Sequence, residues 1–144
     1  MSLDVKEEYF QRGDKLFSQG DKNNGVFIVN EGEVAIVKKL EKKFSLVGIV
    51  KRKEFLGGAS LFSDDTRSAT AICLSNVKVV KISRDQILNF IESKPSWVKD
   101  LFKALVDRLN DSSDLMIINN VEKELSFEAY GLEANWIKSL VTSK

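Results

Sequence analysis

Short runs of apolar residues, separated by turn residues, make up the chain as far as about residue 83. Many of these runs are rich in Val, Ile and Phe, and turn residues such as Gly20-Asp21 recur between them. Runs of this kind, with turn signals roughly every eight to twelve residues, are typical of an antiparallel β-sandwich or barrel. We therefore expect strands at residues 15–17, 26–29, 34–37, 44–50, 54–56, 69–74 and 77–82.

Two turns can be placed from their composition. The segment Asn30-Glu31-Gly32 separates two runs that are rich in β-branched residues. Glycine adopts a positive φ without steric cost, as tight hairpin turns require, so this segment predicts a hairpin between neighbouring strands. The charged stretch 38–43 predicts the solvated tip of a second hairpin.

The spacing of the apolar residues becomes helical after Ser83. Residues 85–91 predict a short helix. Pro95 suits the first turn of the next helix, because the N–H that proline lacks has no partner in that turn. Apolar residues then recur at helical spacing over residues 97–118, and a shorter amphipathic stretch covers residues 132–141.

Trp97 and Phe102 belong to the apolar stripe of the long predicted helix. We expect both to pack in the core against the strands, and the alternative is an aromatic residue that caps a ligand. Further along the same helix, the apolar residues Leu109, Leu115, Met116 and Ile118 predict either a dimer interface or a face that folds back on the barrel.

The order of the elements, strands first and helices last, predicts two parts. Residues 1–118 form a β-barrel unit with its helix, and residues 119–144 form a helical extension. The extension carries large apolar side chains such as Phe127, Trp136 and Ile137, so we expect it to pack on the barrel or on a partner.

Composition limits the classes of function. The 144 residues are 43% hydrophobic and 30% charged with a net charge of +1, which suits one globular domain and gives no electrostatic case for binding nucleic acid or an acidic membrane. No apolar run is long enough to cross a bilayer, and residues 1–10 lack the apolar centre of a secretory signal. We therefore expect a cytoplasmic protein.

The chain contains no histidine and one cysteine, Cys73. Ser-His and Cys-His nucleophile pairs and histidine-ligated metal sites are therefore excluded. A single cysteine also excludes an internal disulfide, and its apolar neighbours predict a buried, unreactive thiol. We expect no catalytic residue, no metal and no cofactor.

The segment from Glu54 to Thr70 contains the residues that point to chemistry. Gly57 and Gly58 end a predicted strand, and Arg67 comes just before the next one. Glycines allow close approach of the backbone to a ligand, and exposed N–H groups at a helix start favour an anion. A guanidinium fits two phosphate oxygens. These residues alone leave a phosphate site and a structural turn equally open, and in a turn Arg67 would pair with the neighbouring acidic residues Asp64 or Asp65.

The same segment resembles the phosphate-binding cassette of cyclic nucleotide-binding domains. The matching residues are Phe55, Gly57, Ala59, Leu61 and Arg67-Ser68-Ala69-Thr70. The similarity extends over residues 5–118. It implies an antiparallel β-barrel or jelly roll with a phosphate-binding cassette and a C-terminal lid helix, as in bacterial cyclic-AMP receptor proteins.

The resemblance also implies the ligand contacts. Arg67 would pair with the cyclic phosphate, and Ser68 would form a hydrogen bond with the phosphate or the base. The backbone N–H groups of residues 58–61 would hold phosphate and ribose oxygens. Val47 would lie along the pocket wall, and Arg108 and Ser112 would contact ligand or partner from the lid helix. The complete expected set is Gly57, Gly58, Ala59, Ser60, Leu61, Arg67, Ser68, Ala69, Val47, Arg108 and Ser112.

One position departs from the family pattern. The family's ribose-binding glutamate should stand at position 58, where this chain has glycine. Loss of a charged hydrogen bond costs about 2–3 kcal/mol, or roughly 50-fold in affinity. Glu54 is nearby in sequence but lies on the strand side, so we do not expect it to substitute.

The expected function is a stand-alone signalling module that binds a cyclic nucleotide such as cAMP. It would relay ligand state through its C-terminal helices to a protein partner. Because the long helix dimerises in receptor-like relatives, a homodimer through the helix at 95–118 is also expected. The alternative is a degenerate domain that binds no nucleotide and serves as a protein-interaction module. The last 35 residues or so are too few for an added helix-turn-helix, so we expect no DNA binding. The short apolar runs and the low net charge predict no membrane contact.

Overall fold

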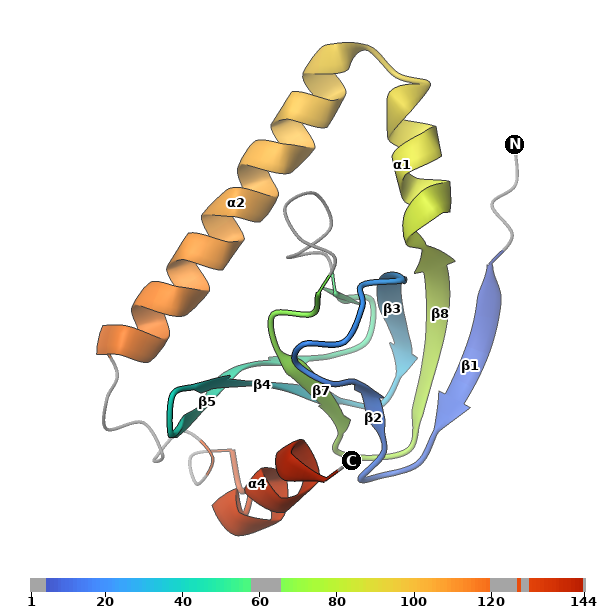
Figure 1. The fold of residues 1–144 in the computed structure, drawn as a ribbon. Helices are drawn as coiled ribbons and strands as arrows, with labels where there is room; N and C mark the ends of the chain where they lie inside the picture. Colours follow the sequence, from blue (N-terminus) through green and yellow to red (C-terminus); the bar gives the residue numbers. More distant parts are fainter. Residues whose placement is uncertain (1–4, 58–65, 120–126, 128–129, 144) are drawn as a thin grey trace.

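The computed structural model describes residues 5–57, 66–119, 127 and 130–143. Within these residues, eight strands form two four-stranded antiparallel sheets with the orders β1-β8-β3-β6 and β2-β7-β4-β5 (Figure 1). The strands are β1 (Lys6–Phe10), β2 (Lys15–Phe17), β3 (Gly25–Glu31), β4 (Val34–Leu40), β5 (Lys43–Val50), β6 (Phe55–Leu56), β7 (Thr70–Cys73) and β8 (Val77–Ser83).

The helices follow the strands, as the apolar spacing predicts. They are α1 (Arg84–Glu92), α2 (Ser96–Asn119) and α4 (Ala134–Thr142). Ser83 starts α1 with a capping box, in which the Gln86 amide donates to Ser83 Oγ and the Ser83 amide donates to Gln86 Oε1. In the described part of the chain, no helix is both long and apolar enough to cross a membrane.

The mainly antiparallel jelly-roll fold is confirmed, but the sequence pattern missed β1. This strand has the sequence KEEYF and pairs along one side with β8. It is the edge of its sheet, and most of its side chains are exposed. As an edge strand with mostly charged residues, it lacks the apolar run from which the other strands were predicted, although Phe10 packs against the core.

The predicted hairpin at residues 30–32 is wrong in its pairing. β3 pairs with β6 and β8, whereas β4 pairs with β5 and β7, so the turn carries the chain from one sheet to the other. The turn packs on the loop between β7 and β8, because the Leu74 amide donates to the Glu33 carbonyl and the Glu33 amide donates to Ser75 Oγ. Gly32 has φ of +87°, so its predicted positive φ is confirmed.

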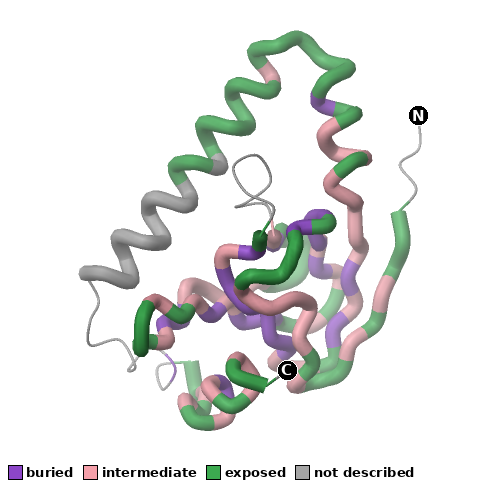
Figure 2. The backbone as a smooth tube through the Cα atoms, in the orientation of Figure 1, coloured by how far each residue is buried: buried purple, intermediate pink, exposed green. Residues whose placement is uncertain are grey.

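Two apolar clusters hold the molecule together (Figure 2). The first lies between the sheets and contains Phe27, Val29, Val34, Leu56, Ala71, Cys73, Val77 and Val79. The second lies on the other face of the β2-β7-β4-β5 sheet, where Ala35, Val37, Leu46 and Ile72 pack with Phe127 and Ile137 from the C-terminal segment. This sheet is therefore covered on both faces.

The expectation that Trp97 and Phe102 lie in the core is wrong. α2 contacts α1 at one end and also contacts β5, and it runs as a straight helix outside the two sheets (Figure 1). Trp97 is 64% exposed and Phe102 is 45% exposed. Helical spacing shows that a helix has an apolar face, but it does not show what covers that face.

We predict that Gly32→Ala destabilises the fold strongly. A Cβ atom at this position would lie 2.3 Å from the Asn76 carbonyl oxygen, and the positive φ adds strain. We expect the melting temperature to fall by at least about 5 °C. Gly48→Ala is the matched control, because a Cβ atom there meets nothing within 4 Å. Equal melting temperatures for the two variants would contradict this account of the turn.

Candidate ligand site around Arg67

Arg67 is fixed in place by main-chain hydrogen bonds before its side chain is considered. Its amide donates to the Asp21 carbonyl over 2.6 Å, and its carbonyl accepts from the Gly20 amide over 2.9 Å. Lys22 and Thr66 form an antiparallel bridge beside these bonds. The turn at Gly20-Asp21 therefore sets the position of Arg67, although the two segments lie far apart in the sequence.

The Arg67 guanidinium is buried among aromatic rings and main chain. The residue is 2% exposed, and its Cζ lies 4.1 Å from the centre of the Phe17 ring and 5.7 Å from that of Phe27. Nη1 donates to the Gly57 carbonyl and Nη2 donates to Asn24 Oδ1, each over 3.1 Å. Nε is buried and has no hydrogen-bond partner among the described residues.

Among the described residues, the charge of Arg67 is only weakly compensated. Burial lowers the pKa of the guanidinium to about 10, while the nearby Asp21 opposes this shift. The group therefore keeps its positive charge at neutral pH. The two groups that accept hydrogen bonds from the guanidinium, the Asn24 side-chain amide and the Gly57 main-chain carbonyl, are both neutral. A buried cation with an unused N–H is costly by itself and is well suited to receive an anion.

Gly57 is required by the position of Arg67. It has φ of +90°, and a Cβ atom there would lie 2.3 Å from Nη1 of Arg67. Any other residue would displace the guanidinium or the end of β6. The glycine therefore allows the end of β6 to approach the Arg67 side chain closely.

A hollow of about 120 Å³ opens beside the guanidinium. Its walls are mainly apolar, and Arg67 supplies the charge. Phe55 stands at this hollow with 67% of its surface exposed. The lining residues are Phe17, Ile36, Val50, Phe55, Leu56, Gly57, Arg67, Ser68 and Ala69.

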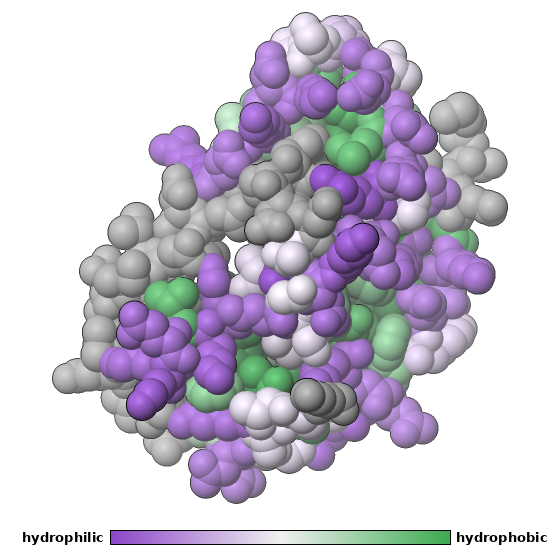
Figure 3. Space-filling model, in the orientation of Figure 1, coloured by the Kyte–Doolittle hydropathy of each residue, from purple (hydrophilic) through white to green (hydrophobic). Residues whose placement is uncertain are grey.

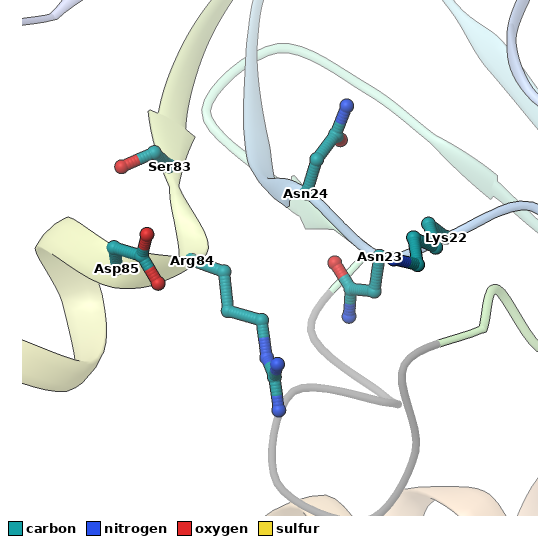
Figure 4. A pocket seen from close by; sticks show the side chains of 6 residues that line it. All are labelled: Lys22, Asn23, Asn24, Ser83, Arg84 and Asp85. Atoms are coloured by element: carbon teal, nitrogen blue, oxygen red, sulfur yellow. The ribbon is translucent and has the colours of Figure 1, made fainter.

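A second hollow of about 260 Å³ lies at the start of α1 (Figure 4). It is lined by Lys22, Asn23, Asn24, Ser83, Arg84 and Asp85. Asn23 is buried, with its Oδ1 accepting from the Gly25 amide and its Nδ2 lying 3.5 Å from the Gly57 carbonyl. The two asparagines therefore separate this hollow from the Arg67 site.

The structure brings together four of the expected contact residues, Gly57, Arg67, Ser68 and Ala69. Val47 lies in β5 at a bulge and does not line the hollow. Arg108 is exposed on α2, and Ser112 lies in the same helix, where its side chain is not described. Gly58, Ala59, Ser60 and Leu61 lie outside the described residues, as do the alternative Arg67 partners Asp64 and Asp65.

Sequence reasoning missed the residues that hold Arg67 from other parts of the chain. Asn24 and Phe17 contact its guanidinium, and Ile36 and Val50 line the wall. The available signal was Asn24 itself, a polar residue directly before a buried strand. Glu54 is engaged elsewhere, because its Oε1 accepts from the Lys51 amide over 2.8 Å.

The sequence pattern of the cyclic nucleotide-binding domain family matches residues 7–94. This match spans more than half of the chain and includes Gly57 and the Arg67-Ser68-Ala69 run. The chain therefore belongs to the cyclic nucleotide-binding domain family, as its cassette residues indicated.

Curated relatives include transcriptional regulators and protein kinases. A CRP-like cAMP-activated global transcriptional regulator of Mycobacterium tuberculosis is 26% identical over 112 residues, which is 74% of this chain and 50% of the regulator. The Cyclic AMP receptor protein of Thermus thermophilus is 26% identical over 139 residues, covering 90% of this chain and 63% of that protein. The chain thus spans about half to two thirds of these two relatives.

Solved structures share the fold. The N-terminal domain of a transcriptional regulator from Streptomyces coelicolor is 27% identical with a TM-score of 0.58, covering 76% of this chain and 79% of that one. The EAL enzyme Bd1971 in its cAMP-bound form is 23% identical with a TM-score of 0.67, covering 87% of this chain and 33% of the enzyme. The second likeness supports the fold alone.

We predict that Arg67→Met does not destabilise the ligand-free protein. The substitution removes a buried charge whose Nε has no partner in the part of the chain that the structure describes. Replacing a buried ionic group with a well-packed apolar one is often neutral or stabilising by about 1 kcal/mol or more. We expect an unchanged or higher melting temperature.

The control is Lys42→Met, which removes the same charge at an exposed position between β4 and β5. A melting temperature well below those of wild type and Lys42→Met would show that the hydrogen bonds of Arg67 hold the fold. It would contradict the view that this residue is kept for a ligand.

Proposed function

We propose that this domain binds a cyclic nucleotide of the cAMP type and that Arg67 receives its phosphate. The observation that carries the proposal is the Nε of Arg67, a charged donor that is buried but unpaired among the described residues. A phosphate oxygen accepts a hydrogen bond from such a donor and compensates the charge at the same time.

The shape of the hollow supports a particular orientation of the ligand. Its volume of about 120 Å³ is below the roughly 300 Å³ at which pockets for whole ligands begin, so the described walls enclose only part of a nucleotide. The phosphate would lie at Arg67 and Ser68, and the sugar would lie along Ile36 and Val50. The base would lie toward the mouth, beside the exposed ring of Phe55.

The proposed role is regulatory rather than catalytic. Curated relatives of this domain are named as a cAMP-activated transcriptional regulator and a cyclic AMP receptor protein. We propose that the nucleotide-binding unit extends through α2, to residue 118, and that residues 119–144 are its extension. Ligand would shift the position of α2, which requires tighter binding to one of its positions, and a protein partner would respond to that shift.

The exposed face of α2 supports a second copy of this chain as one partner. Trp97, Leu101 and Leu105 follow one another at intervals of four residues and are 64%, 49% and 54% exposed. Apolar side chains also reach the surface where α1 and α2 meet (Figure 3). A two-fold pair of α2 helices would bury both stripes at once.

The glycine at position 58 gives the proposal a sharp test, because the ligand's 2′-hydroxyl then has no carboxylate at that position. We predict that the wild-type protein binds cAMP and 2′-deoxy-cAMP with nearly equal affinity in calorimetric titrations. Gly58→Glu should tighten cAMP binding by about 10- to 50-fold and leave 2′-deoxy-cAMP unchanged.

Two variants serve as controls for these titrations. Arg67→Met should bind neither nucleotide, whereas Lys42→Met should bind both like wild type. Failure of cAMP, cGMP and cyclic di-GMP to bind wild-type protein at millimolar concentration would overturn the proposal. The domain would then be a protein-interaction module that has kept its fold, the alternative that Gly58 favours.

We predict that wild-type protein is a dimer and that Leu101→Asp is a monomer, because a carboxylate would be buried in the paired helices. Light scattering after size-exclusion chromatography measures the mass directly. Lys103→Gln is the control: it changes the net charge by the same amount on the opposite side of α2. A monomeric wild type, or a dimeric Leu101→Asp, would contradict pairing through this face.

A further inference from the structure

The C-terminal segment, which here means Phe127 and residues 130–143, is attached to the back of the sheet that forms the ligand hollow. Phe127 and Ile137 are fully buried, and Leu132, Trp136 and Leu140 pack around them. These side chains cover the outer face of the β2-β7-β4-β5 sheet. In Figure 1, α4 lies on the side of this sheet opposite α2.

Residues on the two faces of this sheet alternate along the same strands. Ile36 of β4 lines the hollow, and its neighbours Ala35 and Val37 pack on the C-terminal segment. Val50 of β5 lines the hollow, and its neighbour Ile49 packs on the segment. A shift of either strand therefore changes the ligand wall and the C-terminal contact together.

β2 provides a second and more direct connection. It is a three-residue edge strand, and its pairing with β7 is irregular between Lys15 and Phe17. Lys15 Nζ donates to the Ser143 carbonyl and to Ser143 Oγ. Phe17 lies beneath the Arg67 guanidinium at 4.1 Å. One short strand thus holds the end of the chain with one residue and the ligand-binding cation with another.

The segment just before β2 also contacts α4. The Arg12 guanidinium lies 4.4 Å from the centre of the Trp136 ring. A Cβ atom at Gly13 would lie 3.7 Å from the same ring, which shows how closely α4 approaches the chain there. A short, irregularly paired edge strand is weakly fixed by its own sheet, so these contacts contribute to its position.

We propose that docking of the C-terminal segment on the outer face of the β2-β7-β4-β5 sheet positions Phe17 and the hollow wall for ligand, so that docking and cyclic-nucleotide binding strengthen each other. Ile137 and Lys15 are positioning residues in this scheme, because neither touches the hollow. The inference rests on the proposed nucleotide-binding function. By thermodynamic reciprocity, ligand must strengthen docking by the same factor by which docking strengthens ligand binding.

The test measures both sides of this reciprocity in the full chain at low temperature, where each variant is folded. We expect Ile137→Ala to weaken cAMP binding by about 5- to 50-fold in calorimetry. We expect cAMP to slow hydrogen exchange of the α4 amides in wild type by a similar factor. In a Trp97→Phe background the remaining tryptophan, Trp136, reports docking by its fluorescence.

Two further variants separate positioning from general stability. Ile91→Ala removes a buried side chain of α1, which contacts β3 and β8 of the other sheet, and should lower the melting temperature without changing the affinity for cAMP. Lys15→Ala removes the hydrogen bonds from this half-buried side chain to Ser143, and should weaken cAMP binding while the fold is kept.

Three results would overturn the inference. If Ile137→Ala and Lys15→Ala loosen α4 but bind cAMP like wild type, the two events are not linked. If Ile91→Ala weakens binding as much as Ile137→Ala, the effect is general instability. If wild type binds no cyclic nucleotide, the proposed function itself fails and the inference falls with it, whereas the first two results leave that function standing.

Discussion

The burial of one guanidinium organises the ligand side of this protein. Arg67 is 2% exposed, yet its charge is met by two neutral acceptors and by aromatic rings, and its Nε is unpaired among the described residues. A fold selected for stability alone gains little from such a group. The rest of the site is arranged around it: Gly57 leaves room for it, Asn24 holds one end, and Phe17 supports its face.

The sheet arrangement explains how such a group can be held. Arg67 lies just before β7, and β7 lies between β2 and β4 in its sheet. β2 brings Phe17, and the turn at Gly20-Asp21 brings main-chain partners. The same sheet is covered from behind by the C-terminal segment. The ligand site, the edge strand and the end of the chain are thus parts of one packed layer.

Local sequence patterns were enough to predict most of the strands and helices. Seven strands and three helices follow from spacing and turn chemistry over a few positions, whereas Gly57 and Arg67 were assigned to the cassette by the resemblance to the family. The features that the sequence did not predict depend on tertiary contacts. β1 is a mostly charged edge strand without an apolar run, and the turn at Gly32 leads into the other sheet rather than into a hairpin. Asn24 reaches Arg67 across 43 positions, and the exposure of Trp97 depends on where α2 lies.

The central claim is that Arg67 is held ready for an anion, and its Nε–H group reports this directly. The measurement is the nitrogen-edited NMR signal of that group during titration with cAMP, assigned by its loss in Arg67→Lys. The account predicts a large downfield shift that saturates with the ligand, because the unused donor gains a charged acceptor. An Nε–H signal that stays in place would contradict the account, whether cAMP binds elsewhere on the protein or does not bind.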